Sequence, residues 1–434
     1  MSIKQKVKKI VPKGSIKFYH LGRAIMANLA YGFPSQPMRI IGITGTNGKT
    51  TSSFLVKSIL KAAGRKVGML TTVSFEIDGK SERNALNMTT VNPFLLQKYL
   101  RKMKQAGCQD VIVETTSHAI DQYRIWGIEY YVVAVTNVTH DHLDYHGTFK
   151  DYLATKQKLF ALPHQISVVN ADDEYFESFW NYPAKRKISY GLKATKTDVT
   201  ARKLLSETDS SLFTLITPEA QTVVKLPLPG EFNVYNALTA ASIATGLGIK
   251  IETIKKGLEA AEPVPGRMEP VTVEKINTPY TIIIDYAHTP DALEKAMQSV
   301  KQAGKGRLIA VYGACGDRDK TKRPILGAIG GRLADIVIIT DEEAYTESPK
   351  AIIEEVAAGV ERGAAKDNPK VLNQNYFIIN DRREAIAKAI DLAKLGDCIL
   401  VTGMGDQSYK VVGTEHIPWS DRDVIRELIR ARSK

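Results

Sequence analysis

The stretch ITGTNGKTT, residues 43–51, has the residue types and spacing that point most directly to chemistry. The apolar, β-branched run before it predicts a buried strand, and a predicted helix begins at Lys49. A glycine-rich loop between a strand and a helix presents backbone N–H groups and a positive dipole end to an anion. Lys49 can reach the β- and γ-phosphates, and the Thr50 hydroxyl can ligate Mg²⁺. The stretch therefore predicts a nucleoside triphosphate site. Its residues are Gly45, Thr46, Asn47, Gly48, Lys49, Thr50 and Thr51.

Two more polar positions follow predicted strands. Glu114 ends the buried run VIVE, at the edge where open α/β sheets bind ligands, and can hold Mg²⁺ against the triphosphate. Residues 137–147, NVTHDHLDYHG, form the densest polar cluster. A single histidine ligand to Mg²⁺ suits this loop better than zinc, because no cysteine or second histidine cluster completes a tetrahedral set. A capping role for Glu114 and a purely structural turn for the loop are the alternatives. Lys156 alone would be interpreted as a surface lysine.

Charged residues also follow strands in the second half of the chain. The segment DYAHTPD, residues 285–291, ends a strand and starts a helix, with Thr289 as the cap before a first-turn proline. The loop GACGDRDKTKR, residues 313–323, can bring Arg318, Lys320 or Arg323 to a phosphate as charge accumulates in a transition state. A solvated run of charges is the alternative interpretation.

The elements that must position these residues alternate between strand and helix, which predicts parallel sheets covered by helices. Residues 187–228 are expected to add antiparallel strands to the edge of the first sheet. The sequence PVPG, residues 263–266, predicts a linker and hinge. We expect an α/β protein in which a P-loop domain precedes a Rossmann-like α/β domain, with a cleft between them. The expected parts are residues 1–37, 38–264 and 265–434. Strands are expected at 40–43, 67–71, 110–115, 131–136, 167–170, 280–285, 307–312, 336–340 and 398–401. Helices are expected at 49–63, 93–106, 149–160, 234–247, 251–260, 291–303, 349–360, 383–393 and 421–432.

Composition restricts the class of protein. No apolar run approaches the ~20 residues that span a bilayer, and no signal peptide is recognised. Three widely spaced cysteines do not form a disulfide framework or a zinc site, which fits a reducing cytoplasm. The net charge of +12 fits an anionic small substrate. Residues 21–33 predict a short amphipathic helix packed on the first sheet, with a membrane-surface anchor as the alternative.

These motifs resemble the Mur ligases, most specifically the UDP-N-acetylmuramyl-tripeptide synthetases (the MurE type). The resemblance extends from about Met38 to Asp421. It is carried in order by ITGTNGKTT, ETTSHAIDQYR, TNVTHDHLDYHGTFKDYLATK, NADDE, LPGEFNVYN, VPGRME, DYAHTPDALEKA and GDRDKTKRP. Eight motifs in register are far more specific than any one of them.

The resemblance implies an ATP-dependent amide ligase of peptidoglycan precursor synthesis. Such enzymes activate a substrate carboxylate as an acyl phosphate, which the amine of an amino acid then attacks. The resemblance implies that Lys49 acts on the triphosphate with Thr50, that Glu114 and His142 hold two magnesium ions, and that Lys156 is carbamylated to ligate magnesium. The implied ATP residues beyond the loop are Asn233, Asn236, Arg267, Asp285, Tyr286, His288, Asp317 and Arg318. The implied substrate residues are Thr89, Thr90, Ser117, Gln122, Arg124, Arg323, Glu342, Tyr345, Asp406 and Gln407.

Two departures from the family pattern bear on the substrates. The family's first domain, which binds the uridine nucleotide, is much longer than the 37 residues that precede the first strand here. Either UDP is held differently, or the acceptor is another carrier, such as a lipid-linked one. The family's DNPR motif reads EEAY at residues 342–345, and its GKGHE motif reads GMGDQ at residues 403–407. Tyr345 thus replaces the arginine that would pair with the distal carboxylate of diaminopimelate, which argues against that amino acid.

Other functions share parts of this pattern. A folylpolyglutamate synthase-like ligase has the same two-domain core, and a non-catalytic relative would bind ATP without using it. A nucleic-acid motor is disfavoured because no basic-aromatic stripe is present. We expect a monomer that acts on small molecules (a UDP-sugar peptide or related carrier, and an amino acid), with no nucleic acid partner and no stable membrane insertion.

Overall fold

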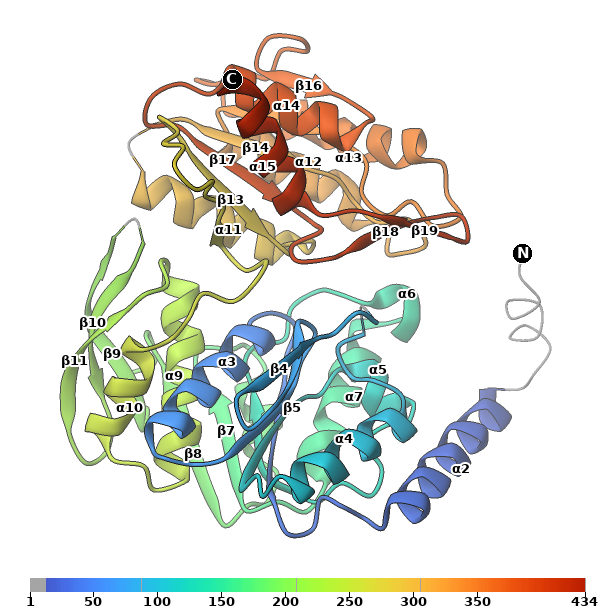
Figure 1. Ribbon diagram of the computed structural model, residues 1–434, viewed down its shortest axis with the longest axis vertical. Coiled ribbons are helices and arrows are strands. Elements are labelled where there is room, and N and C mark those ends of the chain that lie inside the picture. The colour runs from blue at the N-terminus through green and yellow to red at the C-terminus, as the bar shows by residue number, and fades with distance from the viewer. Residues whose placement is uncertain (1–12, 87, 208, 305, 434) are drawn as a thin grey trace.

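Two sheets in succession organise the chain in the computed structural model, which describes residues 13–86, 88–207, 209–304 and 306–433. The first sheet is the lower body in Figure 1, and the second sheet is the upper body. A segment without regular secondary structure, residues 261–268, connects them and contains the predicted PVPG linker. The two prolines and the glycine of that linker account for the break.

The first sheet has eleven strands in the order β11-β10-β9-β8-β7-β6-β1-β5-β2-β3-β4. Its centre, from β8 to β2, is parallel, and the predicted antiparallel strands follow beyond β9. A hairpin that was not predicted, β3–β4, extends the opposite edge. The strands are β1 (Arg39–Thr44), β2 (Val67–Leu70), β3 (Ser74–Ile77), β4 (Lys80–Arg83), β5 (Asp110–Glu114), β6 (Tyr130–Val135), β7 (Ile166–Asn170), β8 (Arg186–Gly191), β9 (Val199–Ser206), β10 (Ser211–Ile216) and β11 (Gln221–Leu226).

Helices cover both faces of this sheet, as expected for a parallel sheet. The alternation within β1 shows why: Ile41 and Ile43 belong to one core, while Ile40 belongs to the core on the other face. The helices of this unit are α3 (Lys49–Ala62), α4 (Pro93–Gln105), α5 (Ser117–Asp121), α6 (Leu143–His146), α7 (Phe149–Ala161), α8 (Phe176–Trp180), α9 (Glu231–Gly246) and α10 (Ile251–Glu259).

The second sheet has six strands in the order β12-β13-β17-β14-β15-β16, all parallel except β12. The strands are β12 (Glu269–Pro270), β13 (Thr281–Asp285), β14 (Leu308–Tyr312), β15 (Ile336–Ile339), β16 (Tyr376–Ile378) and β17 (Cys398–Thr402), with a separate hairpin of β18 (Tyr409–Val412) and β19 (Glu415–Pro418). The helices are α11 (Pro290–Ala303), α12 (Lys322–Leu333), α13 (Pro349–Gly363), α14 (Arg382–Leu392) and α15 (Asp421–Arg432). The predicted fold class is confirmed.

Helix α2 (Lys13–Tyr31) precedes the first strand and is longer than the predicted helix at 21–33. It packs against α4, not directly on the sheet as predicted. Its inner side contains Ala24, Ala27 and Asn28, and Asn28 Nδ2 donates a 2.7 Å hydrogen bond to the carbonyl of Trp126. Among the described residues, no helix is both long and apolar enough to cross a membrane. The three cysteines are free.

The main helix absent from the prediction is α12, whose first two residues lie in the segment that was predicted to be a loop. Its glycines lower intrinsic helix propensity, but here they allow close packing on α13. An added Cβ on Gly327 would overlap the backbone carbonyl of Val356, and one on Gly359 would overlap that of Pro324. Tertiary contact therefore overrides the local preference.

Candidate active site

The loop between β1 and α3 has the conformation of an anion-binding loop. Gly48 caps α3 with φ +84°, in the left-handed region, and an added Cβ would overlap the side-chain oxygen of Asn236. Asn47 N donates to Asn137 Oδ1 at 3.0 Å, so the neighbouring strand's loop fixes the turn. The positive end of α3 therefore lies at this loop.

Two lysines from different helices meet at this loop. Lys49 Nζ donates to the carbonyl oxygens of Gly45 and Thr46 at 2.9 and 2.8 Å, and Lys156 Nζ donates to the same Gly45 oxygen at 2.8 Å. Lys156 is 1 % exposed, and its ammonium also lies 4.6 Å from the centre of the Tyr152 ring. Burial, with the charge of Lys49, lowers the pKa of Lys156 well below its usual value. No carboxylate forms an ion pair with Lys156 among the described residues.

Glu114 ends β5 beside the loop and is fully buried. One of its carboxylate oxygens, Oε2, accepts hydrogen bonds from Thr72 N at 3.2 Å and Thr72 Oγ1 at 2.9 Å. The other, Oε1, is buried and has no hydrogen-bond partner within the described part of the chain. Burial raises the pKa of Glu114, although the charge of Lys49 opposes the shift. Leaving a buried carboxylate oxygen unpaired is unfavourable, so Oε1 is a candidate ligand for a cation.

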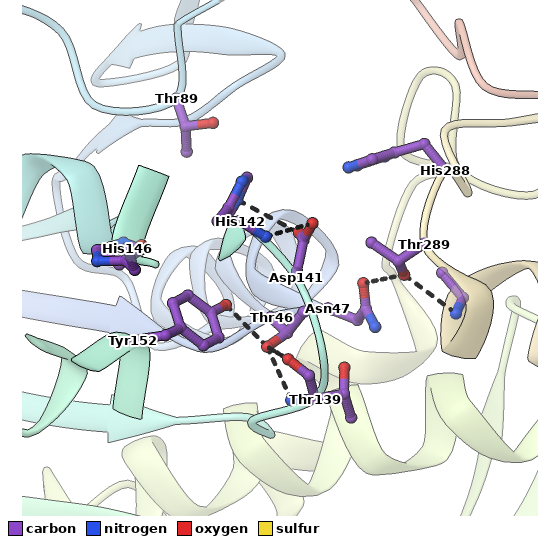
Figure 2. A network of polar contacts seen from close by, with 12 residues as sticks. Thr46, Asn47, Thr89, Thr139, Asp141, His142, His146, Tyr152, His288 and Thr289 are labelled. Atoms are coloured by element: carbon purple, nitrogen blue, oxygen red, sulfur yellow. Dashed lines mark hydrogen bonds and ion pairs between the residues drawn. The ribbon is translucent and has the colours of Figure 1, made fainter. Parts of the chain in front are cut away.

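The histidine loop after β6 supplies the next side of the site (Figure 2). His142 has φ +56°, a strained conformation for a residue other than glycine and one that is often found at functional sites. The Asp141 carboxylate accepts from His142 N at 2.9 Å and lies 3.3 Å from His142 Nε2. Burial lowers the pKa of His142 well below its usual value, so its imidazole is neutral at pH 7, the form that ligates metals. Figure 2 shows His288, from the second half of the chain, extending toward His142, while Thr89 lies on the opposite side of the view, at the upper left.

The two halves of the chain contact each other directly at the phosphate loop. Asn47 Nδ2 donates to Asp291 Oδ2 at 2.7 Å, and Thr289 Oγ1 donates to Asn47 Oδ1 at 3.4 Å. Arg267 Nη2 lies 3.4 Å from Thr50 Oγ1. Asn47 and Thr50 follow β1 in the first half of the chain. Their partners lie in the second half, after β13 (Thr289 and Asp291) and just before β12 (Arg267). The site is therefore formed by both halves of the chain together.

Comparisons with known proteins identify this arrangement. Residues 43–244 match the Mur ligase middle domain, and residues 266–405 match the Mur ligase glutamate ligase domain. The UDP-N-acetylmuramoyl-L-alanyl-D-glutamate--2,6-diaminopimelate ligase of Clostridium botulinum is 41 % identical over 94 % of this chain and 81 % of the relative. The chain belongs to the Mur ligase family. It is therefore an ATP-dependent amide ligase of the kind that builds peptidoglycan precursors, and the predicted resemblance is confirmed.

Solved structures agree with this assignment. A UDP-N-acetylmuramoyl-L-alanyl-D-glutamate--2,6-diaminopimelate ligase with 28 % identity has a TM-score of 0.65 over 95 % of this Mur ligase and 83 % of that chain. A folylpolyglutamate synthase from Mycobacterium tuberculosis, solved with ADP and AMPPCP, has a TM-score of 0.70 at 20 % identity, over 88 % of this chain and 92 % of its own. The second likeness shows a shared fold, which explains why folylpolyglutamate synthase was a reasonable alternative from the sequence.

Several residues expected to bind ATP line the interface between the halves of the Mur ligase. Asn236 Nδ2 donates to Asn233 Oδ1 at 3.1 Å directly behind Gly48. The guanidinium of Arg267 lies 4.4 Å from the centre of the Tyr286 ring, and Asp285 accepts hydrogen bonds from Met268 N and Ala287 N. Asp317 does not extend into this group, because its carboxylate accepts from the Thr346 hydroxyl at 2.8 Å.

A second group of expected substrate residues surrounds the loop after β5. Arg124 Nη1 donates a 2.5 Å hydrogen bond to the carbonyl of Thr90, and Arg124 Nη2 donates a 2.6 Å hydrogen bond to Gln122 Oε1. The Thr72 hydroxyl donates a 2.8 Å hydrogen bond to the Thr89 hydroxyl. Because Thr72 also bonds to Glu114, this contact extends the hydrogen-bond network from Glu114 to Thr89. Ser117 Oγ lies 3.0 Å from His146 Nε2. These side chains form one connected layer on the first half of the chain.

A third group lies on the second half of the chain. Tyr345 donates to Glu343 Oε2 at 3.2 Å, and Gln407 Nε2 lies 3.4 Å from the same atom. Glu342 is buried, accepts a hydrogen bond from the thiol of Cys315 at 3.0 Å, and keeps Oε2 unpaired within the described residues. The Arg318 guanidinium lies 5.3 Å from the centre of the Tyr345 ring.

Two expected substrate residues make other contacts. Arg323 is fully buried and donates to Glu347 at 3.0 and 2.9 Å and to Glu355 at 2.8 Å, so its charge is already paired within the second half of the chain. Asp406 accepts a hydrogen bond from the Arg83 guanidinium through its main-chain carbonyl, which joins the β3–β4 hairpin to the second half.

Sequence reasoning named Asp141 only as part of the histidine loop, and it missed Lys322 and Asp291. Asp141 is 6 % exposed, and although burial would raise its pKa, the charges of His142, Lys322 and His288 hold that pKa well below its usual range. Lys322 is 5 % exposed at the start of α12, and Asp291 bonds to the phosphate loop. The signal for Lys322 was present in the segment GACGDRDKTKR, but choosing it over its charged neighbours requires knowing where α12 begins.

Proposed function

We propose that this Mur ligase joins an amino acid to the carboxylate of a UDP-N-acetylmuramoyl dipeptide-type acceptor through an acyl phosphate, in the cytoplasm. One observation carries the proposal. Lys49, Lys156 and the unpaired Oε1 of Glu114 gather around a phosphate loop that the second half of the chain contacts through Asp291. Such a set can hold a triphosphate, a cation and a second substrate in one enclosed space.

The residues of the chain account for the charge changes of two steps. In the first, an acceptor carboxylate oxygen bonds to the γ-phosphorus of ATP, and the bond from that phosphorus to ADP breaks. Lys49, the N–H groups of α3 and Arg267 stabilise the negative charge on the phosphoryl oxygens. In the second, the amine nitrogen bonds to the acyl carbon, inorganic phosphate leaves with the electron pair of the C–O bond, and the nitrogen loses a proton. Closure of the two halves keeps water from the acyl phosphate.

The residues present fit a magnesium site. The fit rests on Glu114 Oε1, a buried oxygen without a partner, with Thr50 and a neutral His142 as further candidate ligands. The described residues hold no group of three or more His, Cys, Asp or Glu side chains close enough to bind a metal by themselves. That agrees with Mg²⁺, which keeps waters and substrate phosphates among its ligands and uses few protein groups. The ions would neutralise phosphate charge, and Glu114, His142 and a modified Lys156 would hold them.

Carbamylation of Lys156 accounts for a buried lysine that forms no ion pair with a described carboxylate. A neutral amine adds to carbon dioxide, forming an N–C bond, and loss of a proton leaves a carbamate with one negative charge. Burial lowers the pKa of Lys156 and so favours the neutral amine that this reaction needs. The change replaces a cation beside Lys49 with an anion, which removes a repulsion and provides a ligand for Mg²⁺.

The contacts around Tyr345 suggest which amino acids fit. Glu343 and the unpaired oxygen of Glu342 make the group acidic, while Arg318 supplies a cation over the Tyr345 ring. We propose that Arg318 receives the single carboxylate of the amino acid, and that an uncharged or cationic side chain points toward the glutamates. The proposed amino acid differs from that of the relative described above, whose name specifies 2,6-diaminopimelate.

The direct experiment measures phosphate release from ATP for UDP-sugar peptides in combination with a panel of amino acids. We expect release to require both an acceptor and an amino acid, with UDP-N-acetylmuramoyl-L-alanyl-D-glutamate as an active acceptor. Folate with glutamate serves as the control for the related ligase fold. Turnover with folate and none with any UDP-sugar peptide would contradict the proposal.

A further inference from the structure

The outward side of α2 is apolar, and its large side chains are exposed. Phe18 is 77 % exposed, Tyr19 60 %, Met26 54 % and Leu29 66 %. At 100° per residue these side chains lie within about a third of the helix circumference. The buried side of the same helix, with Ala24 and Ala27, faces the opposite direction. In Figure 1, α2 lies at the periphery of the first unit, with α4 on its inner side.

The sequence that contains this apolar side is basic. Residues 1–38 contain seven Lys and Arg residues and no Asp or Glu, and the first acidic residue of the chain is Glu76. Within α2, Arg23 lies over the Tyr19 ring at 5.5 Å, and Lys17 forms an ion pair with Asp121 at 3.5 Å. Helix α4, which packs against α2, has no acidic residue either. Its exposed cations are Lys98, Arg101, Lys102 and Lys104.

We propose that the outward side of α2 is a docking surface for an anionic lipid membrane. A helix that lies in the plane of a membrane interface places apolar and aromatic side chains among the acyl chains and cations among the phosphates. Phe18, Met26 and Leu29 supply the first contribution. Arg23, over the Tyr19 ring, and the acid-free basic sequence that contains it supply the second, because anionic headgroups attract basic segments beside an apolar face.

Charge is what favours a lipid surface over a second protein here. Interfaces between proteins are depleted in lysine, and a twofold contact between two copies of α2 would bring two acid-free basic segments together. Anionic headgroups instead attract a basic segment of this kind. The inference is independent of the proposed ligase reaction, since neither α2 nor α4 supplies a residue to the site described above.

The test uses the full chain and sedimentation with vesicles of phosphatidylglycerol and phosphatidylcholine, or of phosphatidylcholine alone. We expect binding to the mixed vesicles that weakens at least about tenfold when NaCl is raised from about 0.05 to 0.5 M. The double variant F18E/L29E is expected to lose binding at least about tenfold, because it places two anions in the apolar strip. The matched control L205E/L395E makes the same charge change at side chains that are 60 % and 85 % exposed elsewhere, and should bind as the wild type does.

A second readout reports insertion directly. In the variant Phe18→Trp, brominated acyl chains should quench the added tryptophan fluorescence, whereas the wild-type signal should change little. Equal binding by F18E/L29E and the wild type, or equal binding to neutral and anionic vesicles, would overturn the proposal. A wild-type dimer that F18E/L29E dissociates, without vesicle binding by either protein, would also overturn it and assign the surface to a second copy.

Discussion

Lys49 and Lys156 donate hydrogen bonds to the same acceptor, the main-chain carbonyl of Gly45, at 2.9 and 2.8 Å. Two ammonium groups that converge on one dipole repel each other, and burial intensifies the repulsion because the dielectric is low. The pKa of Lys49 is lowered by burial, and that of Lys156 is lowered by burial and by Lys49. The arrival of an anion, or a change in the charge of one lysine, would relieve this repulsion.

The first prediction follows from that pair. Lys156→Ala should reduce phosphate release at least about 100-fold in kcat while ATP affinity changes less than about tenfold, because Lys49 and the helix terminus still hold the triphosphate. Steady-state kinetics and nucleotide titration measure the two effects. Short carboxylic acids added to this variant should restore part of the rate by occupying the cavity of a carbamate. Lys156→Arg is the control, since its larger side chain keeps the charge and leaves no cavity. A wild-type rate for Lys156→Ala would mean that the assigned metal site is wrong.

The second prediction concerns the contact between the two halves. Asp291→Ala removes the 2.7 Å hydrogen bond to Asn47 and should lower kcat about tenfold, because hydrogen bonds to charged groups contribute about 1.5–3 kcal/mol. Lys295→Ala is the matched control, since it removes only the ion pair of Asp291 within α11. That exposed pair contributes about 0.3–0.5 kcal/mol, so its loss should leave kcat unchanged. Equal losses in the two variants would show that helix stability, and not closure, accounts for the effect.

Much of the first half of the chain could be predicted because local chemistry determines it. A β-branched run, glycines and GKTT specify a strand, a loop and a helix within about twenty residues, and the structure contains them as β1 and α3. The same holds for Thr289 and Pro290, where the predicted cap accepts a hydrogen bond from Ala292 N. Such signals need no knowledge of distant residues.

Other features depend on partners that are distant in the sequence. The contact of Asn47 with Asp291 joins residues 244 positions apart, so no local pattern could pair them. Lys322 was not predicted for the same reason. It is buried at the start of α12, where its charge acts on Asp141 of the histidine loop, and no local pattern shows that these two segments come together. Arg323 is an error in the opposite direction. Its guanidinium suggested a contact with phosphate, but in the structure it is paired with Glu347 and Glu355, which are distant in the sequence.

The third prediction tests the helix that local propensity does not reveal. Gly327→Ala improves intrinsic helix propensity but places a methyl group against the Val356 carbonyl, so it should destabilise the protein by about 1–3 kcal/mol. Gly22→Ala is the control, because nothing lies within 4 Å of its added Cβ, and it should stabilise α2 by up to about 1 kcal/mol. Urea unfolding of both variants provides the comparison. A gain in stability for Gly327→Ala would show that α12 and α13 are not closely packed.

The fourth prediction concerns pH. Burial lowers the pKa of His288 to about 4, against about 6.5 in an unfolded chain. The folded state therefore resists protonation, and the contribution of His288 to stability is complete above pH 6.5 and lost as the pH falls toward 4. Allowing for partial exposure, the loss between pH 7 and 5 should be about 1–2 kcal/mol.

Urea unfolding at both pH values measures that loss. His288→Gln can keep a donor for the Tyr286 carbonyl, which His288 Nδ1 approaches at 2.8 Å, but it does not titrate. The decrease in stability from pH 7 to pH 5 should therefore be smaller in the variant than in the wild type. Identical decreases would show that His288 is already solvated in the folded protein.

The last prediction concerns the choice of amino acid, where the chain departs from its relatives. Tyr345 stands where the family pattern has an arginine, and its hydroxyl donates to Glu343 at 3.2 Å, so no guanidinium is available at this position for a second carboxylate. The wild type should therefore not prefer diaminopimelate over lysine in kcat/KM. Tyr345→Arg restores a bidentate donor and should shift the ratio toward diaminopimelate about tenfold. Tyr345→Phe removes the hydroxyl without adding charge and should leave the ratio unchanged. A clear diaminopimelate preference in the wild type would mean that another cation, such as Arg318 at 5.3 Å from the Tyr345 ring centre, binds the distal carboxylate.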